Sequence, residues 1–79
     1  MYYVYMLTSE TGDLYIGCTG DLRKRLREHN AGEVRSTKGK RWKLNYYEAY
    51  ESLNLARRRE YRLKHHGQAK RQLLSRIKE

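Results

Sequence analysis

The chain contains no proline, no phenylalanine and a single cysteine, Cys18. One cysteine excludes an internal disulfide and favours a reducing compartment, where we expect it to be a small buried apolar residue. No run approaches the roughly 20 apolar residues that a membrane-spanning helix needs. The N-terminal "MYYVYML" lacks the basic start and cleavage-site pattern of a secretory signal. We therefore expect a cytoplasmic protein without a membrane partner.

Acidic residues are also scarce, with nine Asp and Glu against 18 Lys and Arg, and the net charge is +9. A charge of this size on 79 residues is typical of a protein that binds a polyanion, although a merely soluble or ribosome-associated basic protein has the same composition. Without phenylalanine, the aromatic content is eight Tyr and one Trp, so that almost every ring carries a polar group. Such rings fill a core, and they also suit phosphate chemistry or base stacking.

The chain has no internal repeat, low-complexity tract or linker, and residues 1–79 are short enough to form only one domain. The local patterns predict a small α/β (α+β) fold in the order ββαβαα, with a three-stranded antiparallel sheet flanked by three helices. The expected strands are residues 2–8, 14–18 and 43–50. The expected helices run from a Thr19 or Asp21 cap to about Asn30, from a Ser52 or Asn54 cap to about His66, and over about 68–77, where Leu73, Leu74 and Ile77 are the apolar contacts.

On the first predicted helix, Leu22 and Leu26 share one face, and helical spacing puts Arg25 and His29 on the edge of this apolar stripe. Two interpretations are open for Arg25 and His29. They are boundary side chains whose polar ends reach solvent, or they face a functional site.

On the second predicted helix, Glu60 falls inside the apolar arc formed by Leu53, Ala56 and Leu63. An ionised carboxylate facing the core is costly unless a cation meets it. The alternatives are an ion pair with Arg25 or a ligand for a hard divalent cation. The neighbouring His65 and His66 diverge around the helix, and we expect them to complement the helix dipole rather than bind metal.

In the predicted hairpin, Tyr15 and Gly17 share one face of their strand. A register in which partner numbers add to twenty would put Tyr5 directly across from Tyr15. Gly17 would then leave open space beside the two rings, although a bulge or a strand end explains this glycine nearly as well.

These residues together resemble a known family. "YVY" at residues 3–5, "YIG" at 15–17, "DLRKRLREHN" at 21–30 and "ARRREYRLK" at 56–64 are similar to the successive motifs of the GIY-YIG nuclease domain, in particular its short stand-alone bacterial members. The resemblance covers nearly the whole chain. It implies a three-stranded antiparallel sheet flanked by helices, with the functional side chains on one surface.

The resemblance also implies roles for individual residues. The four expected catalytic residues are Tyr5, Tyr15, Arg25 and His29. Glu60 would bind one Mg²⁺ or Mn²⁺, and Arg25 would stabilise charge on the phosphate. Either Tyr5 or a water assisted by His29 would take the first proton, and we expect neighbouring cations to lower the pKa of the Tyr5 phenol.

Two departures from the family pattern are visible. Tyr3 stands where the family has glycine, and the last ten residues contain no Asn or Asp, whereas many family nucleases carry a polar residue there. Larger members have additional DNA-binding domains, so targeting would come from this chain's own surface or from a partner protein. The long basic loop can contact the nucleic-acid backbone or simply be solvated. Its candidate residues are Arg35, Lys38, Lys40 and Arg41, with Trp42 as a stacking ring.

The resemblance therefore favours a metal-dependent endonuclease that hydrolyses phosphodiester bonds of DNA in repair or recombination. The alternative is a catalytically weak or inactive nucleic-acid-binding module of the same fold. A basic protein-interaction domain is a third interpretation, and it makes no use of the five candidate site residues.

Overall fold

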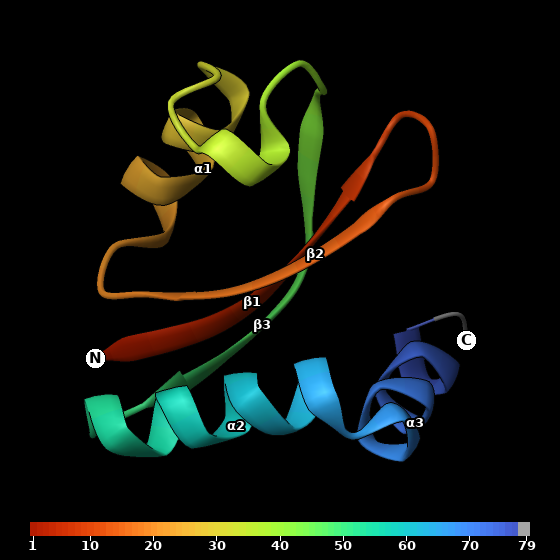
Figure 1. Cartoon of the computed structure of the whole chain (residues 1–79). Helices are drawn as coiled ribbons and strands as arrows, with labels where there is room; N and C mark the ends of the chain where they lie inside the picture. The colour runs from red at the N-terminus through yellow and green to blue at the C-terminus, as the bar shows by residue number, and fades with distance from the viewer. Residues whose placement is uncertain (78–79) are drawn as a thin grey trace.

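The computed structural model describes residues 1–77, except for the side chains at positions 69, 70, 72, 76 and 77. A three-stranded antiparallel sheet has the strand order β2-β1-β3, and the chain follows the predicted order ββαβαα (Figure 1). A short 3₁₀ turn, η1, interrupts the basic loop before the third strand. The elements are β1 Tyr2–Ser9, β2 Leu14–Thr19, α1 Leu22–Asn30, η1 Arg35–Thr37, β3 Trp42–Tyr50, α2 Leu53–His65 and α3 Gly67–Ile77.

The β1–β2 hairpin turns through Glu10, Thr11 and Gly12. Gly12 has φ of 86°, in the left-handed region that glycine adopts most easily. The N–H of Ser9 donates to the carbonyl of Asp13 at 3.0 Å and so closes a three-residue loop. The register that results pairs Tyr5 with Gly17 and Leu7 with Tyr15. The expected pairing of Tyr5 with Tyr15 is therefore wrong by two residues, although both rings remain on the same face of the sheet.

The third strand carries an irregularity that turns part of it over. Met6 pairs with Tyr46 whereas Leu7 pairs with Leu44, so Asn45 is an extra residue without a partner on β1. A bulge of this kind shifts the alternation of side chains by one position. As a result, Trp42 and Leu44 face the same side of the sheet as Tyr5, while Tyr46 faces the other side.

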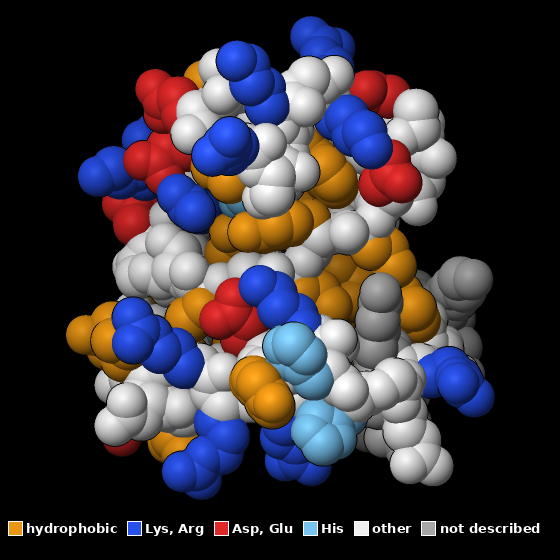
Figure 2. Space-filling view, viewed as in Figure 1, with side chains coloured by type: hydrophobic (Ala, Val, Ile, Leu, Met, Phe, Trp, Pro, Cys, Tyr) orange, Lys and Arg blue, Asp and Glu red, His pale blue; other side chains and the backbone are white. Residues whose placement is uncertain are grey.

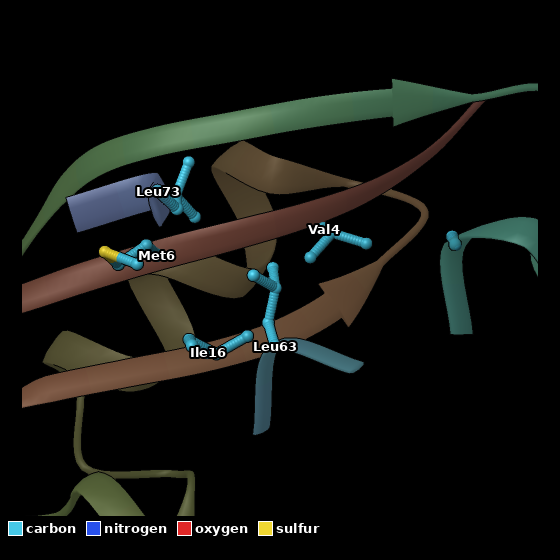
Figure 3. Packing of buried hydrophobic residues seen from close by; sticks show 6 residues of the cluster. Val4, Met6, Ile16, Leu63 and Leu73 are labelled. Carbon is cyan, nitrogen blue, oxygen red and sulfur yellow. The ribbon is translucent and has the colours of Figure 1, made fainter. Parts of the chain in front are cut away.

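The sheet has a separate apolar cluster on each face. Figure 1 shows α1 on one side of the sheet and α2 and α3 on the other. One cluster joins Tyr5, Leu7 and Trp42 to the partly buried Leu22 and Leu26 of α1. The other joins the sheet to α2 and α3, and Figure 3 shows Leu63 projecting from α2 toward β1 and β2. Its buried members are Val4, Met6, Ile16, Ala56, Leu63 and Leu73. Both faces of the central strand are thus covered, which explains its uninterrupted apolar sequence.

The helix boundaries agree closely with the prediction because capping side chains mark them. Asp21 accepts a hydrogen bond from the backbone N–H of Lys24, and Ser52 accepts one from Asn54. Each side chain satisfies a backbone donor that a helix N-terminus leaves without an internal partner. Leu73 of α3 is buried in the core and Leu74 packs against it, as expected. The predicted contact of Ile77 lies outside the described side chains.

A polar cluster stabilises the packing of α2 on β3. The Glu48 carboxylate accepts hydrogen bonds from Nε and Nη2 of Arg59, at 2.9 and 3.0 Å, and from the hydroxyls of Tyr46 and Tyr50. Burial alone would raise the pKa of Glu48, but these hydrogen bonds outweigh burial and lower the pKa.

Cys18 is partly buried and packs against the apolar cluster between the sheet, α2 and α3, where burial raises the pKa of its thiol. Within residues 1–77, no helix has the length and apolar character to cross a bilayer.

Candidate active site at the open edge of the sheet

The ring of Tyr5 lies directly over Gly17 on the neighbouring strand. A β-carbon at position 17 would come within 2.6 Å of Cζ of Tyr5 and 3.0 Å of Cε2 of Tyr15. Strand β2 continues regularly past this position, so Gly17 is neither a bulge nor a strand end. The expected open space beside the rings is filled by Tyr5 itself. Gly17 is therefore needed because any side chain there would displace Tyr5.

The hydroxyl of Tyr5 is the first member of a buried hydrogen-bond chain. It lies 2.8 Å from Nε2 of His29, whose Nδ1 lies 2.7 Å from the hydroxyl of Thr37. Thr37 in turn donates to the carbonyl of Val34 at 3.3 Å. His29 is 0% exposed, so it is not a boundary side chain that reaches solvent, and Tyr5 is 3% exposed.

The direction of this chain follows from its last member. We assign the single hydroxyl proton of Thr37 to the carbonyl of Val34, and with this assignment Thr37 accepts a hydrogen bond from the Nδ1–H of His29. Nε2 of His29 then carries no proton and accepts the hydrogen bond from Tyr5. Burial, together with the positive charge of Arg25, lowers the pKa of His29 and keeps the imidazole neutral at neutral pH. The site thus contains a neutral imidazole in contact with a phenol proton.

The pKa of Tyr5 moves opposite to the sequence-based expectation. Burial raises it to about 12, and the hydrogen bond and charge of Arg25 only partly oppose this effect. Desolvation disfavours the phenolate more strongly than one nearby cation favours it. Tyr5 therefore keeps its proton at neutral pH and is not a free base by itself.

Arg25 lies at the solvent side of this cluster. Its guanidinium hydrogen-bonds with Tyr5 and pairs with Glu28 at 3.1 Å, and both contacts raise the pKa of Arg25. The Arg25 side chain is only partly buried, so it keeps its charge and remains accessible to an anion. The alternative ion pair between Arg25 and Glu60 is not observed.

Tyr15 completes the aromatic part of the site. Its ring centroid lies 4.8 Å from that of His29 and 6.3 Å from that of Tyr5. It also contacts Trp42, which is 8% exposed and whose indole N–H donates to the carbonyl of Thr37 at 2.9 Å. The predicted role of Trp42 as a stacking ring for nucleic acid is wrong, because the ring is enclosed in the core and holds the Thr37 segment in place.

Glu60 reaches the site from the opposite side of the sheet. Because β2 is an edge strand, side chains of α2 can extend past it toward Tyr15. Nζ of Lys64 lies 3.0 Å from Oε2 of Glu60 and 5.7 Å from the centroid of the Tyr15 ring. The charge of Glu60 also acts on Tyr5, where it raises the pKa of the phenol. The Glu60 side chain is 22% exposed, and so it is neither fully buried nor fully open to solvent.

The surroundings of Glu60 fit a hard divalent cation with few protein ligands. A surface concavity of about 280 Å³ contains Glu60 and Lys64 and is open to solvent. Across the described residues, no three His, Cys, Asp or Glu side chains gather as a metal site. Mg²⁺ commonly binds through one or two carboxylates and completes its shell with waters and substrate phosphates. One partly exposed carboxylate in an open concavity is consistent with that arrangement.

The basic loop has a structural role as well as a charge. Lys40 forms an ion pair with Asp13, and the backbone N–H of Arg41 donates to the Glu10 carboxylate. These contacts attach the loop to the β1–β2 turn. Arg35 and Lys38 are exposed, so their predicted contact with a nucleic-acid backbone stays a prediction.

Sequence analysis did not identify two residues that position the site. Thr37 is 2% exposed inside a loop of charged and small residues, where no periodic pattern distinguishes it. Asn30 was assigned only to the helix end. Its side chain exchanges two hydrogen bonds with the backbone of Trp42, at 2.7 and 3.0 Å, and so joins α1 to β3.

Comparison with known proteins agrees with this geometry. The model of the GIY-YIG catalytic domain matches residues 1–73, which include every residue of the site. The chain belongs to the GIY-YIG family. The family indicates a nuclease-type domain.

Several similar proteins are UPF0213 proteins. A UPF0213 protein of Halobacterium salinarum is 37% identical over 76 residues, covering 94% of this chain and 99% of the relative. A UPF0213 protein of Haloquadratum walsbyi is 36% identical, covering 94% and 85%. The solution NMR structure of a UPF0213 protein from Bacillus halodurans is 35% identical, covers 95% of this chain and 84% of its own, and superposes with a TM-score of 0.59.

Proposed function

We propose that this protein is a divalent-metal-dependent endonuclease that hydrolyses phosphodiester bonds of DNA. The observation that supports the proposal is the cluster of four side chains that β1, β2 and α1 bring together, Tyr5, Tyr15, Arg25 and His29. The Glu60 carboxylate of α2 adjoins this cluster through Lys64, whose Nζ lies near the Tyr15 ring. A protein that only binds phosphate would have no need for a carboxylate on the same surface. The net charge of +9 provides general attraction to nucleic acid.

The buried hydrogen-bond chain supplies a route for the proton of the attacking water. As the water gives a proton to the Tyr5 oxygen, Tyr5 passes its own proton to Nε2 of His29. The water oxygen forms the new bond to phosphorus, and the departing sugar oxygen takes the electron pair of the bond that breaks. Tyr5 is neutral before and after this step, so its raised pKa is no obstacle.

The remaining residues act on charge. Arg25 is accessible and always protonated, and it stabilises the negative charge that develops on the phosphate oxygens. Glu60 would hold one Mg²⁺ or Mn²⁺, which supplies Lewis-acid stabilisation of the same charge. Lys64 lies between Glu60 and Tyr15 and balances the carboxylate when no cation is bound.

The test is a cleavage assay with duplex, nicked, branched and single-stranded DNA in Mg²⁺, Mn²⁺ or chelator. We expect metal-dependent cutting that falls on the order of 10² to 10³-fold in both Glu60→Gln and Arg25→Gln. The matched controls Glu51→Gln and Arg23→Gln remove the same charges from exposed positions and should keep most of the activity.

Two results would contradict the proposal. Cutting that survives Glu60→Gln would assign the activity to a contaminant or to another site. Salt-dependent binding with no cutting of any substrate in either metal would instead favour the nucleic-acid-binding module. Sequence alone suggested a role in repair or recombination, and preferential cutting of nicked or branched DNA in this assay would support that role.

A further inference from the structure

Beside the proposed active site, α2 exposes an aromatic surface that the chemistry does not use. Tyr61 is 59% exposed, and its ring lies 4.3 Å from that of His65, with the two planes tilted by 33°. The ring of His66 lies 6.3 Å from Tyr61. Figure 2 shows His side chains next to a hydrophobic side chain over the C-terminal part of α2.

This aromatic surface adjoins Glu60. Tyr61 and His65 line the same concavity of about 280 Å³ as Glu60, together with Arg57 and Lys64. Three cationic or protonatable side chains thus surround one exposed phenol ring, next to the carboxylate expected to hold the metal ion. Aromatic faces bordered by cations are the surfaces on which single-stranded nucleic acids stack their bases.

We infer that Tyr61 and His65 form a stacking platform for one unpaired nucleobase of the DNA, next to the phosphate that is cut. The faces of bases in a continuous duplex are covered by their neighbours, so only a single strand, flap or frayed end can use the platform. Arg57 and Lys64 contact the phosphates on either side of that base. The inference rests on the proposed function for the position of the scissile phosphate, and it adds a preference for unpaired nucleotides.

A second exposed tyrosine provides the contrast. Tyr47 is 54% exposed and packs edge-on against Tyr3, with the ring centroids 6.0 Å apart. These rings line a groove of about 410 Å³ next to the N-terminus of α1, which also contains the carboxylate of Asp21. This groove includes none of the five site residues. Tyr47 is therefore a matched control: an exposed tyrosine in an aromatic pair, away from Glu60.

The test measures binding in chelator, where no metal-dependent cutting occurs. Fluorescence anisotropy gives the Kd for a single strand and for a blunt duplex of equal length, and 2-aminopurine in the single strand reports stacking by its quenching. We expect Tyr61→Ala to weaken single-strand binding on the order of tenfold and to abolish part of the quenching, with little change for duplex. Tyr61→Phe, which keeps the ring, and Tyr47→Ala should both behave as the unmodified protein.

An equal loss for both forms of DNA, no loss in Tyr61→Ala, or an equal loss in Tyr47→Ala would overturn the inference. Because Tyr61 is exposed, thermal melting should show that Tyr61→Ala folds normally, so a change in Kd reports the lost ring. Failure here leaves the proposed function intact if the unmodified protein still cuts DNA. Conversely, stacking without any cutting would reject the endonuclease and keep the platform.

Discussion

The hydroxyl of Tyr5 and Nε2 of His29 lie 2.8 Å apart, although 24 positions separate the two residues in the chain. Tyr5 stands on the central strand and His29 on the last turn of α1, so this contact joins the sheet to the helix that covers it. Thr37 holds the other side of the imidazole. With Nδ1 of His29 bonded to Thr37, Nε2 is the nitrogen that can accept a proton from Tyr5. Substitutions of Tyr5 and Thr37 can therefore test this arrangement.

Replacing Tyr5 with phenylalanine should remove the proton route while keeping the ring in the core. We expect Tyr5→Phe to lower the single-turnover cutting rate by about 10² to 10⁴-fold, the usual contribution of a positioned acid or base. The loss of stability should be small, about 1–3 kcal/mol, because Nε2 of His29 loses its partner. Rapid-quench kinetics and urea unfolding measure the two effects. A normal cutting rate in Tyr5→Phe would exclude the phenol from the proton transfer.

Thr37→Val should act through His29. Valine has nearly the same shape as threonine but cannot accept the proton of Nδ1, so the tautomer that faces Tyr5 is no longer fixed. We expect a lower kcat with little change in KM and a shifted acid limb of the pH–rate profile. Thr37→Ser, which keeps the hydroxyl, should rescue most of the activity. Equal losses in Val and Ser would indicate a packing role for Thr37 instead.

Much of the fold could be predicted from the sequence because local signals mark its elements. Asp21, Ser52 and Gly12 each have a side-chain or backbone property that begins a helix or turns a hairpin. Helical spacing also indicated that Arg25 and His29 lie near a buried stripe. The five candidate site residues could be named because side-chain periodicity and the family motifs indicated the same positions.

The errors concern interactions that depend on two distant segments. The hairpin register was wrong by two residues because moving a three-residue loop one position along the chain changes the sum of the partner numbers by two, and the sequence does not specify which three residues form the loop. The role of Trp42 was wrong because the bulge at Asn45 turns the start of β3 toward α1, and no residue type signals that bulge. The pKa of Tyr5 was wrong in direction because burial outweighs the effect of Arg25, and burial was not known from sequence.

The depressed pKa of His29 predicts how stability depends on pH. The unfolded chain binds a proton on this residue near its ordinary pKa of 6.5, whereas the folded protein binds it only at lower pH. Between the lowered pKa of the folded state and the ordinary pKa of 6.5, the unfolded state holds more protons than the folded state. The free energy of unfolding therefore rises with pH across this range, and the contribution of His29 is lost as the pH falls below about 6.5. Glu48 adds a second loss at lower pH, below its ordinary value of 4.5, because its folded pKa is also lowered.

Urea unfolding over a series of pH values measures this dependence. His66→Gln, at an exposed position, is the control and should leave the curve unchanged. A free energy of unfolding that stays constant as pH falls through the upper window would contradict a buried neutral imidazole at position 29.

Substitution of Gly17 tests the close approach of the two strands at the site. In Gly17→Ala, the new methyl group would meet Cζ of Tyr5 at 2.6 Å, and the ring cannot move away without leaving His29. Overpacking of this kind costs about 1–3 kcal/mol in unfolding free energy. The cutting rate should fall further than the loss of stability alone explains, because the displaced Tyr5 hydroxyl no longer reaches Nε2 of His29.

Gly20→Ala is the matched control. The added β-carbon would lie 4.0 Å from its nearest neighbour, Cδ1 of Tyr2, so this variant should keep both stability and activity. Equal behaviour of the two alanine variants would show that Tyr5 does not depend on the missing side chain at position 17.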